Sequence, residues 1–105
     1  MRMAACYLIV NYEITDPDLY KEYQKGAGPA LMGQGAELVV FDAKSKQVEG
    51  EGAGHQTVVL KFASREEAEK VYNSEQYQAV VGKRLGASTK HFAVLADEFV
   101  MPAQS

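Results

Sequence analysis

Four residues in the last third of the chain combine side chains suited to binding a small molecule with the spacing of one helix face. They are Ser74, Tyr77, Val81 and Arg84, at positions i, i+3, i+7 and i+10. A guanidinium cannot lose its charge, so Arg84 needs acceptors if this face packs on a sheet. It would hold a carboxylate or an enolate through two parallel hydrogen bonds. Arg84 and Tyr77 are therefore catalytic candidates, and Ser74 is a ligand-binding candidate.

Glu49 is the third catalytic candidate. It stands beside Gly50, where an expected strand gives way to a glycine-rich loop. A carboxylate in that place can act as a general base if it is removed from water. It can equally cap a turn, or form a structural ion pair with Arg84, for which Asp16 is a second possible partner. The sequence leaves these alternatives open.

The chain has six tyrosines and no tryptophan. A tyrosine combines an apolar ring with a hydroxyl that needs a partner when it is buried. Tyr12 and Tyr72 are therefore further ligand-binding candidates, on an expected strand and an expected helix. Packing in the core or between subunits is the alternative explanation for most of the tyrosines.

No metal site and no cofactor are expected. A metal site needs several His, Cys or carboxylate ligands at matched spacing, and no such spacing occurs in the sequence. His55 and His91 each begin an expected strand, which predicts solvent-facing side chains. Cys6 lies in an apolar run, which predicts a buried and unreactive thiol.

Charge and hydropathy exclude further classes of function. Eleven basic and fourteen acidic residues give a net charge of −3, without a basic run. Nucleic-acid grooves need such a run to displace counterions, so no nucleic-acid partner is expected. The apolar stretch at residues 4–10 is too short to span a membrane and precedes no cleavage site. We expect no membrane association and a cytoplasmic location.

Segments with strand and helix patterns alternate along the chain. Strands are expected at residues 5–14, 37–42, 55–62 and 90–98. The second strand either ends at residue 42 or resumes at 47–49, and the sequence leaves both alternatives open. One helix should begin with Asp16 as N-cap and Pro17 in its first turn, and end before Gly33. Another should begin at Ser64, break near residues 73–75 and end at Gly86.

This order, β-α-β-β-α-β, predicts a ferredoxin-like α+β fold, with two helices on one face of an antiparallel sheet. The chain should form a single domain over residues 1–105, with a core at about 5–98 and a tail at 99–105. Three of the four strands carry apolar residues on both faces, whereas a sheet with one wet face alternates apolar with polar residues. A second copy of the chain would cover the other face, so a homodimeric α/β barrel is expected.

Four stretches of sequence resemble the bacterial family known as domain of unknown function 1330. They are Ile14-Thr15-Asp16-Pro17 with Tyr20 and Tyr23; Val48-Glu49-Gly50; residues 58–64 with Glu67-Ala68; and residues 72–78 with Arg84. The resemblance implies the dimeric α/β-barrel fold and does not imply a reaction. The chain departs from the family pattern at Gly35-Ala36, at Phe41 and at Lys61, where the family has a Gly-Gly pair, an Arg and an acid.

The wider superfamily suggests a cofactor-independent enzyme acting on a small aromatic or carbonyl-bearing acid in the cleft between helices and sheet. The alternative is a non-catalytic dimer that binds or senses a small molecule in the same cleft. A third hypothesis is an accessory protein that acts through its dimer surface. Fold alone does not decide among these functions.

Overall fold

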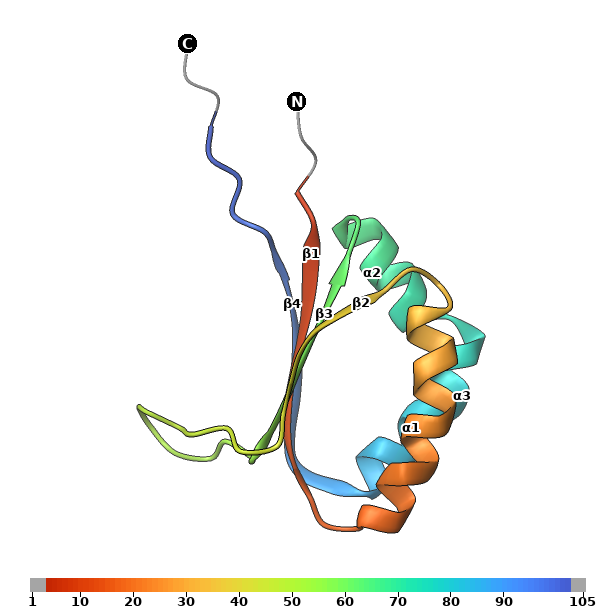
Figure 1. Cartoon of the computed structure of the whole chain (residues 1–105), viewed down its shortest axis with the longest axis vertical. Coiled ribbons are helices and arrows are strands. Elements are labelled where there is room, and N and C mark those ends of the chain that lie inside the picture. The colour runs from red at the N-terminus through yellow and green to blue at the C-terminus, as the bar shows by residue number, and fades with distance from the viewer. Residues whose placement is uncertain (1–3, 103–105) are drawn as a thin grey trace.

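The structure, a computed structural model, describes residues 4–102 and places the helices on one face of a single sheet (Figure 1). The elements are β1 (Cys6–Ile14), α1 (Pro17–Met32), β2 (Glu37–Asp42), β3 (Gln56–Phe62), α2 (Arg65–Tyr72), α3 (Glu75–Gly86) and β4 (Ser88–Asp97). The strands lie in the order β2-β3-β1-β4, and all neighbouring pairs are antiparallel. The predicted α+β class and order of elements are confirmed, and the second predicted helix is divided into α2 and α3.

Side-chain caps set the beginnings of the helices. Asp16 Oδ1 accepts a hydrogen bond from the backbone N–H of Leu19 at 3.1 Å, and Pro17 is the first residue of α1. Ser64 Oγ accepts from the N–H of Glu67, also at 3.1 Å. Ser74 caps α3 in the same way, so the predicted break near residue 74 is a new helix start. Each cap satisfies a backbone donor that has no partner within its helix.

Several predicted boundaries were wrong because strand pairing decides them. β4 begins at Ser88, before the predicted residue 90, because Ser88 and Thr89 pair with the end of β1. Residues 47–49 form no strand and belong to the loop between β2 and β3, where Val48 is largely exposed. Of the predicted tail, residues 99–102 form neither helix nor strand, and 103–105 lie outside the described residues.

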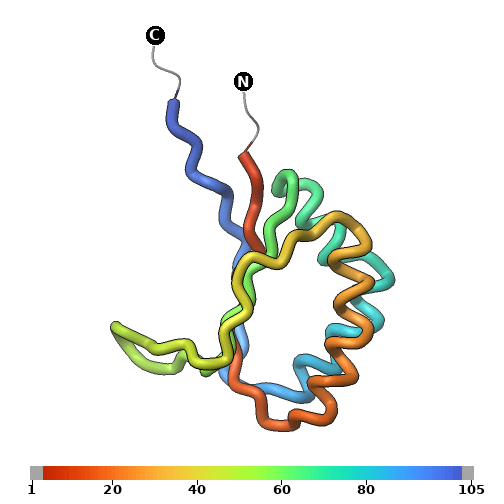
Figure 2. The backbone as a smooth tube through the Cα atoms, viewed as in Figure 1, coloured from red at the N-terminus to blue at the C-terminus, as the bar shows by residue number. Residues whose placement is uncertain are grey.

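The core lies between the helices and one face of the sheet. In the β1–β3 ladder Leu8 pairs with Leu60 and Val10 with Val58, which places these side chains on the same face. Tyr20, Tyr23 and Ala27 of α1 and Tyr77 and Val81 of α3 are also buried in this layer. In Figure 2, α1 runs at a distance from the strands along most of its length.

No helix lies on the other face of the sheet (Figure 1). Ile9 of β1 pairs with Val59 of β3 and Val94 of β4, so these three side chains point to that face. Phe92 and Val94 are 50% and 48% exposed. This outer face of the sheet is therefore apolar and open to solvent. Among residues 4–102, no helix has the length and apolar character required to cross a membrane.

Candidate functional site

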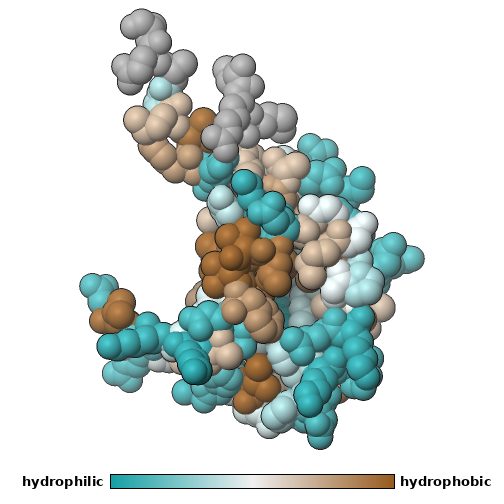
Figure 3. Space-filling view, in the orientation of Figure 1, coloured by the Kyte–Doolittle hydropathy of each residue, from teal (hydrophilic) through white to brown (hydrophobic). Residues whose placement is uncertain are grey.

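A cavity of about 270 Å³ lies between the sheet and the helices. β1 and β3 supply its floor, and α1 and α3 supply the opposite wall. Leu38 and Phe41 of β2 line the cavity and are 45% and 51% exposed, so it opens to solvent along this edge strand. Figure 3 shows hydrophobic side chains gathered beside a hollow in this view. The cavity thus has an apolar mouth and a largely apolar interior, as small-molecule sites commonly do.

Arg84 supplies a buried positive charge to the wall of this cavity. It lies in the last turn of α3 and is only 3% exposed. Its Cζ lies 5.4 Å from the centroid of the Tyr12 ring and 5.9 Å from that of Tyr23, within the range of cation–π interactions. Its Nε has no hydrogen-bond partner among the described residues. The structural ion pair with Glu49 or Asp16 is not formed, because no carboxylate in residues 4–102 pairs with this guanidinium.

Four tyrosine hydroxyls surround the guanidinium as two hydrogen-bonded pairs. The hydroxyls of Tyr12 and Tyr20 lie 2.5 Å apart, and those of Tyr23 and Tyr77 lie 2.8 Å apart. Burial raises the pKa of Tyr12 and Tyr23 well above the ordinary value, and it also raises the pKa of Tyr20. These hydroxyls are therefore protonated at neutral pH and can donate hydrogen bonds to a bound anion, but they are poor general bases.

The structure brings together Arg84, Tyr77 and Tyr12 from the set of predicted site residues, and all three line the cavity. Tyr72 is half-buried and packs on the ring of Tyr77, with centroids 5.3 Å apart, outside the cavity lining. Ser74 is also outside the lining. Its hydroxyl accepts from the N–H of Tyr77 and donates to the carbonyl of Val71 at 2.7 Å. It also accepts from Gln34 Nε2, in the turn after α1, at 3.1 Å. Its contacts are therefore those of a helix cap that is tied to the end of α1.

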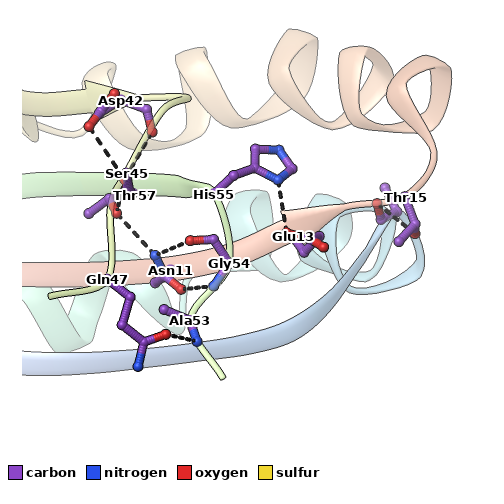
Figure 4. Close-up of polar contacts among 11 residues, drawn as sticks. Asn11, Glu13, Thr15, Asp42, Ser45, Gln47, Ala53, Gly54, His55 and Thr57 are labelled. Atoms are coloured by element: carbon purple, nitrogen blue, oxygen red, sulfur yellow. Dashed lines mark hydrogen bonds and ion pairs between the residues drawn. The ribbon is translucent and has the colours of Figure 1, made fainter. Parts of the chain in front are cut away.

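Glu49 lies apart from Arg84 within one chain. It is exposed in the β2–β3 loop, which projects from the sheet on the side away from the helices (Figure 1). Asn11 of β1 holds the base of this loop: its Oδ1 accepts from the N–H of Gly54 at 2.6 Å, and its Nδ2 donates to Thr57 Oγ1 at 3.0 Å (Figure 4). Among the described residues, the cavity lining therefore contains a cation and no carboxylate.

Metal-ligating side chains do not gather in the described part of the chain. Within residues 4–102, no three His, Cys, Asp or Glu side chains lie close enough together to hold a metal ion. His55 contacts Glu13 Oε1 at 3.1 Å (Figure 4), and the same contact lowers the pKa of Glu13. Cys6 is fully buried, and burial raises the pKa of its thiol.

The family model of domain of unknown function DUF1330 matches residues 5–97. The chain belongs to this family. Among solved structures, a protein of unknown function from Rhodopseudomonas palustris, RPA0582, is 12% identical, with a TM-score of 0.76 over 95% of this chain and 86% of that one. A conserved protein from Methanosarcina mazei Go1 is 9% identical, with a TM-score of 0.58 over 90% and 92% of the two chains. These likenesses support the fold alone.

An uncharacterised NIPSNAP-domain protein from Burkholderia xenovorans is 20% identical, with a TM-score of 0.53 over 93% of this chain and 94% of its own. No functionally curated protein shows significant similarity to the chain.

Two residues that line the cavity were not among the predicted site residues. They are Tyr20 and Tyr23, and their helical spacing with Ala27 was the signal that could have selected them. Gln56 is buried on the same face as Val58 and Leu60, where a polar residue interrupts an apolar alternation. Phe41, one of the departures from the family pattern, lies at the mouth of the cavity. An arginine at that position would make the mouth cationic.

Proposed function

We propose that the protein binds a small carboxylate-bearing molecule with an apolar, aromatic body in the cavity between the sheet and the helices. The observation that carries this proposal is the environment of Arg84. This residue is 3% exposed and lies on the wall of an apolar cavity. Its guanidinium has no carboxylate partner among the described residues, and its Nε has no hydrogen-bond partner there. A buried charge without a counter-charge is strongly destabilising. An anionic ligand supplies the missing charge and leaves the rest of the cavity for an apolar group.

The shape of the cavity supports an aromatic body for this ligand. Tyr20 and Tyr23 stack with centroids 5.8 Å apart, and Tyr23 meets Tyr77 edge-on at 6.3 Å. These rings, with Phe41 at the mouth, offer aromatic faces and edges to a planar group. The carboxylate would lie at Arg84 and the apolar group toward β2.

The test compares phenylacetate with phenylethanol, which has no charge, by calorimetry. We expect wild-type protein to bind the acid at least about tenfold more tightly, because only the acid pairs with the guanidinium. Arg84→Met should remove this preference. Lys83→Met is the matched control, since it removes an exposed positive charge one residue away on the same helix. Equal affinity of the wild type for both compounds, or no affinity for either, would refute the proposal.

A cofactor-independent enzyme acting on a small aromatic or carbonyl-bearing acid is the second candidate. The observation in its favour is the Tyr12–Tyr20 hydroxyl pair, 2.5 Å apart, beside a guanidinium that can stabilise an enolate. The absence of a carboxylate base from the described cavity lining favours binding over catalysis. Solvent deuterium exchange into phenylpyruvate separates the two functions. An enzyme accelerates exchange above the protein-free rate and loses this activity in Tyr12→Phe, whereas a binding protein leaves the rate unchanged.

We further propose that the protein is a homodimer, in which the outer faces of two sheets pack together. The support for this is the apolar character of that face, on which Ile9, Val59, Phe92 and Val94 lie without a covering helix. Monomers seldom leave a large continuous apolar surface in water. A symmetric dimer covers it with the same surface of a second copy. The cavities, on the opposite faces of the sheets, then remain accessible.

A further inference from the structure

The cavity is long in one direction, and its positive charge lies at one end. Its lining includes residues of α1 from Tyr20 to Met32, which span about 18 Å at a rise of about 1.5 Å per residue. On the sheet the lining runs along β1 from Tyr12 to Leu8, about 13 Å at about 3.3 Å per residue. Arg84 lies over the ring of Tyr12. The guanidinium therefore marks one end of this length.

The end of the cavity away from the guanidinium is apolar. Leu8, Leu60 and Leu38 pair across β1, β3 and β2, so they form one row on the helix-facing side of the sheet. Met32 lines the cavity from the end of α1, which a turn of residues 33–36 joins to β2. A ligand held by its charge at the first end therefore meets only apolar side chains of these elements at the second.

Gly28 lies between these two ends, on the wall formed by α1. Gln24 and Met32, one helical turn before and after it, line the cavity as Gly28 itself does. Apart from its chain neighbours and its own helix backbone, a Cβ at Gly28 would meet nothing within 4 Å. A Cβ at Gly26, by contrast, would lie 2.5 Å from Val80 Cγ1 of α3. Gly26 thus serves helix packing, whereas Gly28 leaves space in the cavity that a side chain would fill.

Pro29, the next residue of α1, also favours a glycine at position 28. A proline ring disfavours the helical conformation of the preceding residue, partly through contact with its Cβ. Glycine relieves that contact, so a change in stability would not reveal what Gly28 does for the cavity. Selectivity among ligands of different length does reveal it.

We propose that Gly28 is a specificity-determining residue that admits acids with an extended apolar body. The ligand class is then an arylalkanoic acid, in which a methylene chain separates the carboxylate from the aromatic ring. The carboxylate pairs with Arg84, and the chain passes Gly28 toward the row that contains Leu38. An apolar cavity of about 150 Å³ holds benzene, so a volume of about 270 Å³ leaves room for a longer body. This inference rests on the proposed function and narrows it.

The test measures the affinities of phenylacetate and 6-phenylhexanoate, which has four more methylene groups, for wild type and Gly28→Leu. We expect the wild type to bind the longer acid at least about tenfold more tightly, because each buried methylene group improves affinity about fourfold. Gly28→Leu should lose this preference and keep its affinity for phenylacetate, because the leucine fills only the space beyond the first ring.

Gly82→Leu is the matched control. A Cβ at this exposed glycine of α3 also meets nothing within 4 Å, and Gly82 is outside the cavity lining. This variant should therefore behave as the wild type. If Gly28→Leu does not fold, the same change is made together with Pro29→Ala, which removes the ring that the new Cβ would meet.

The outcomes separate the two proposals. If wild-type protein binds neither acid, the proposed function fails and the role of Gly28 with it. If it binds both acids equally, the anion site stands and the extended body is refuted. A preference for the longer acid that survives in Gly28→Leu, or that is lost equally in Gly82→Leu, refutes the role of Gly28. An equal loss of affinity for both acids in Gly28→Leu refutes it as well, because the change would then act on the anion end.

Discussion

The Arg84 guanidinium lies over the ring of Tyr12, with Cζ 5.4 Å from the ring centroid. A tyrosine face attracts a cation through the ring quadrupole, and this contact replaces part of the lost hydration. It leaves the Nε of the guanidinium without an acceptor among the described residues. The ring therefore positions a charge without neutralising it.

The first prediction concerns the stability of the ligand-free protein. Arg84→Met should raise the free energy of unfolding by about 1–2 kcal/mol, because an apolar side chain of similar length replaces an unpaired buried charge. Urea unfolding of protein refolded without ligand measures the change. Lys83→Met, which removes an exposed charge, should change stability by less than about 0.5 kcal/mol. A loss of several kcal/mol in Arg84→Met would show that the guanidinium has a structural partner.

The second prediction separates helix capping from ligand binding at Ser74. Ser74→Ala should lower the free energy of unfolding by about 1 kcal/mol, because α3 loses the side chain that caps its N-terminus. The affinity for phenylacetate should be unchanged, since Ser74 is outside the cavity lining. Ser74→Thr, which keeps the hydroxyl, is the control for the cap. A tenfold loss of affinity in Ser74→Ala would instead place the hydroxyl in the binding site.

The third prediction addresses the outer face of the sheet. Val94→Asp should convert the proposed dimer to a monomer that keeps its helical content, because Val94 is 48% exposed in the single chain and tolerates a charge there. Analytical ultracentrifugation and circular dichroism measure the two properties. Leu85→Asp, at 43% exposure on α3, introduces the same charge away from the sheet and should leave the dimer intact. A wild-type protein that sediments as a monomer at high concentration would refute the dimer.

The fourth prediction concerns alkaline pH. Burial raises the pKa of Tyr12, Tyr20 and Tyr23 in the folded state, so these hydroxyls release their protons on unfolding once the pH exceeds about 10. Their contribution to stability is complete below that pH and is lost as the pH rises further. The free energy of unfolding should fall by about 1.4 kcal/mol per pH unit for each proton released.

Urea unfolding across the alkaline range, with tyrosinate absorbance as the second signal, measures this effect. Tyrosinate from the buried rings should appear together with loss of structure, and Tyr20→Phe should make the pH dependence shallower. Full ionisation of all six tyrosines in a folded protein would contradict the burial of the three hydroxyls.

The elements and their order follow from local patterns in the sequence. Caps at Asp16 and Ser64 and the break at Ser74 are local hydrogen-bonding signals, so they could be read without knowledge of the fold. Helical spacing also placed Tyr77 and Arg84 on one face, and both line the cavity. The start of β4 could not be read in this way, because it depends on pairing with the distant end of β1.

Which candidate residues meet depends on how distant segments of the chain pack together. Glu49 and Arg84 were plausible partners in sequence, yet the β2–β3 loop carries Glu49 to the side of the sheet away from the helices. Tyr12 and Gln56 are 44 positions apart in the chain and become neighbours through the register of β1 and β3. Whether a buried polar group is paired depends on atoms from distant segments. The unpaired Nε of Arg84, on which the proposed site rests, could therefore be recognised only once those segments had been placed around it.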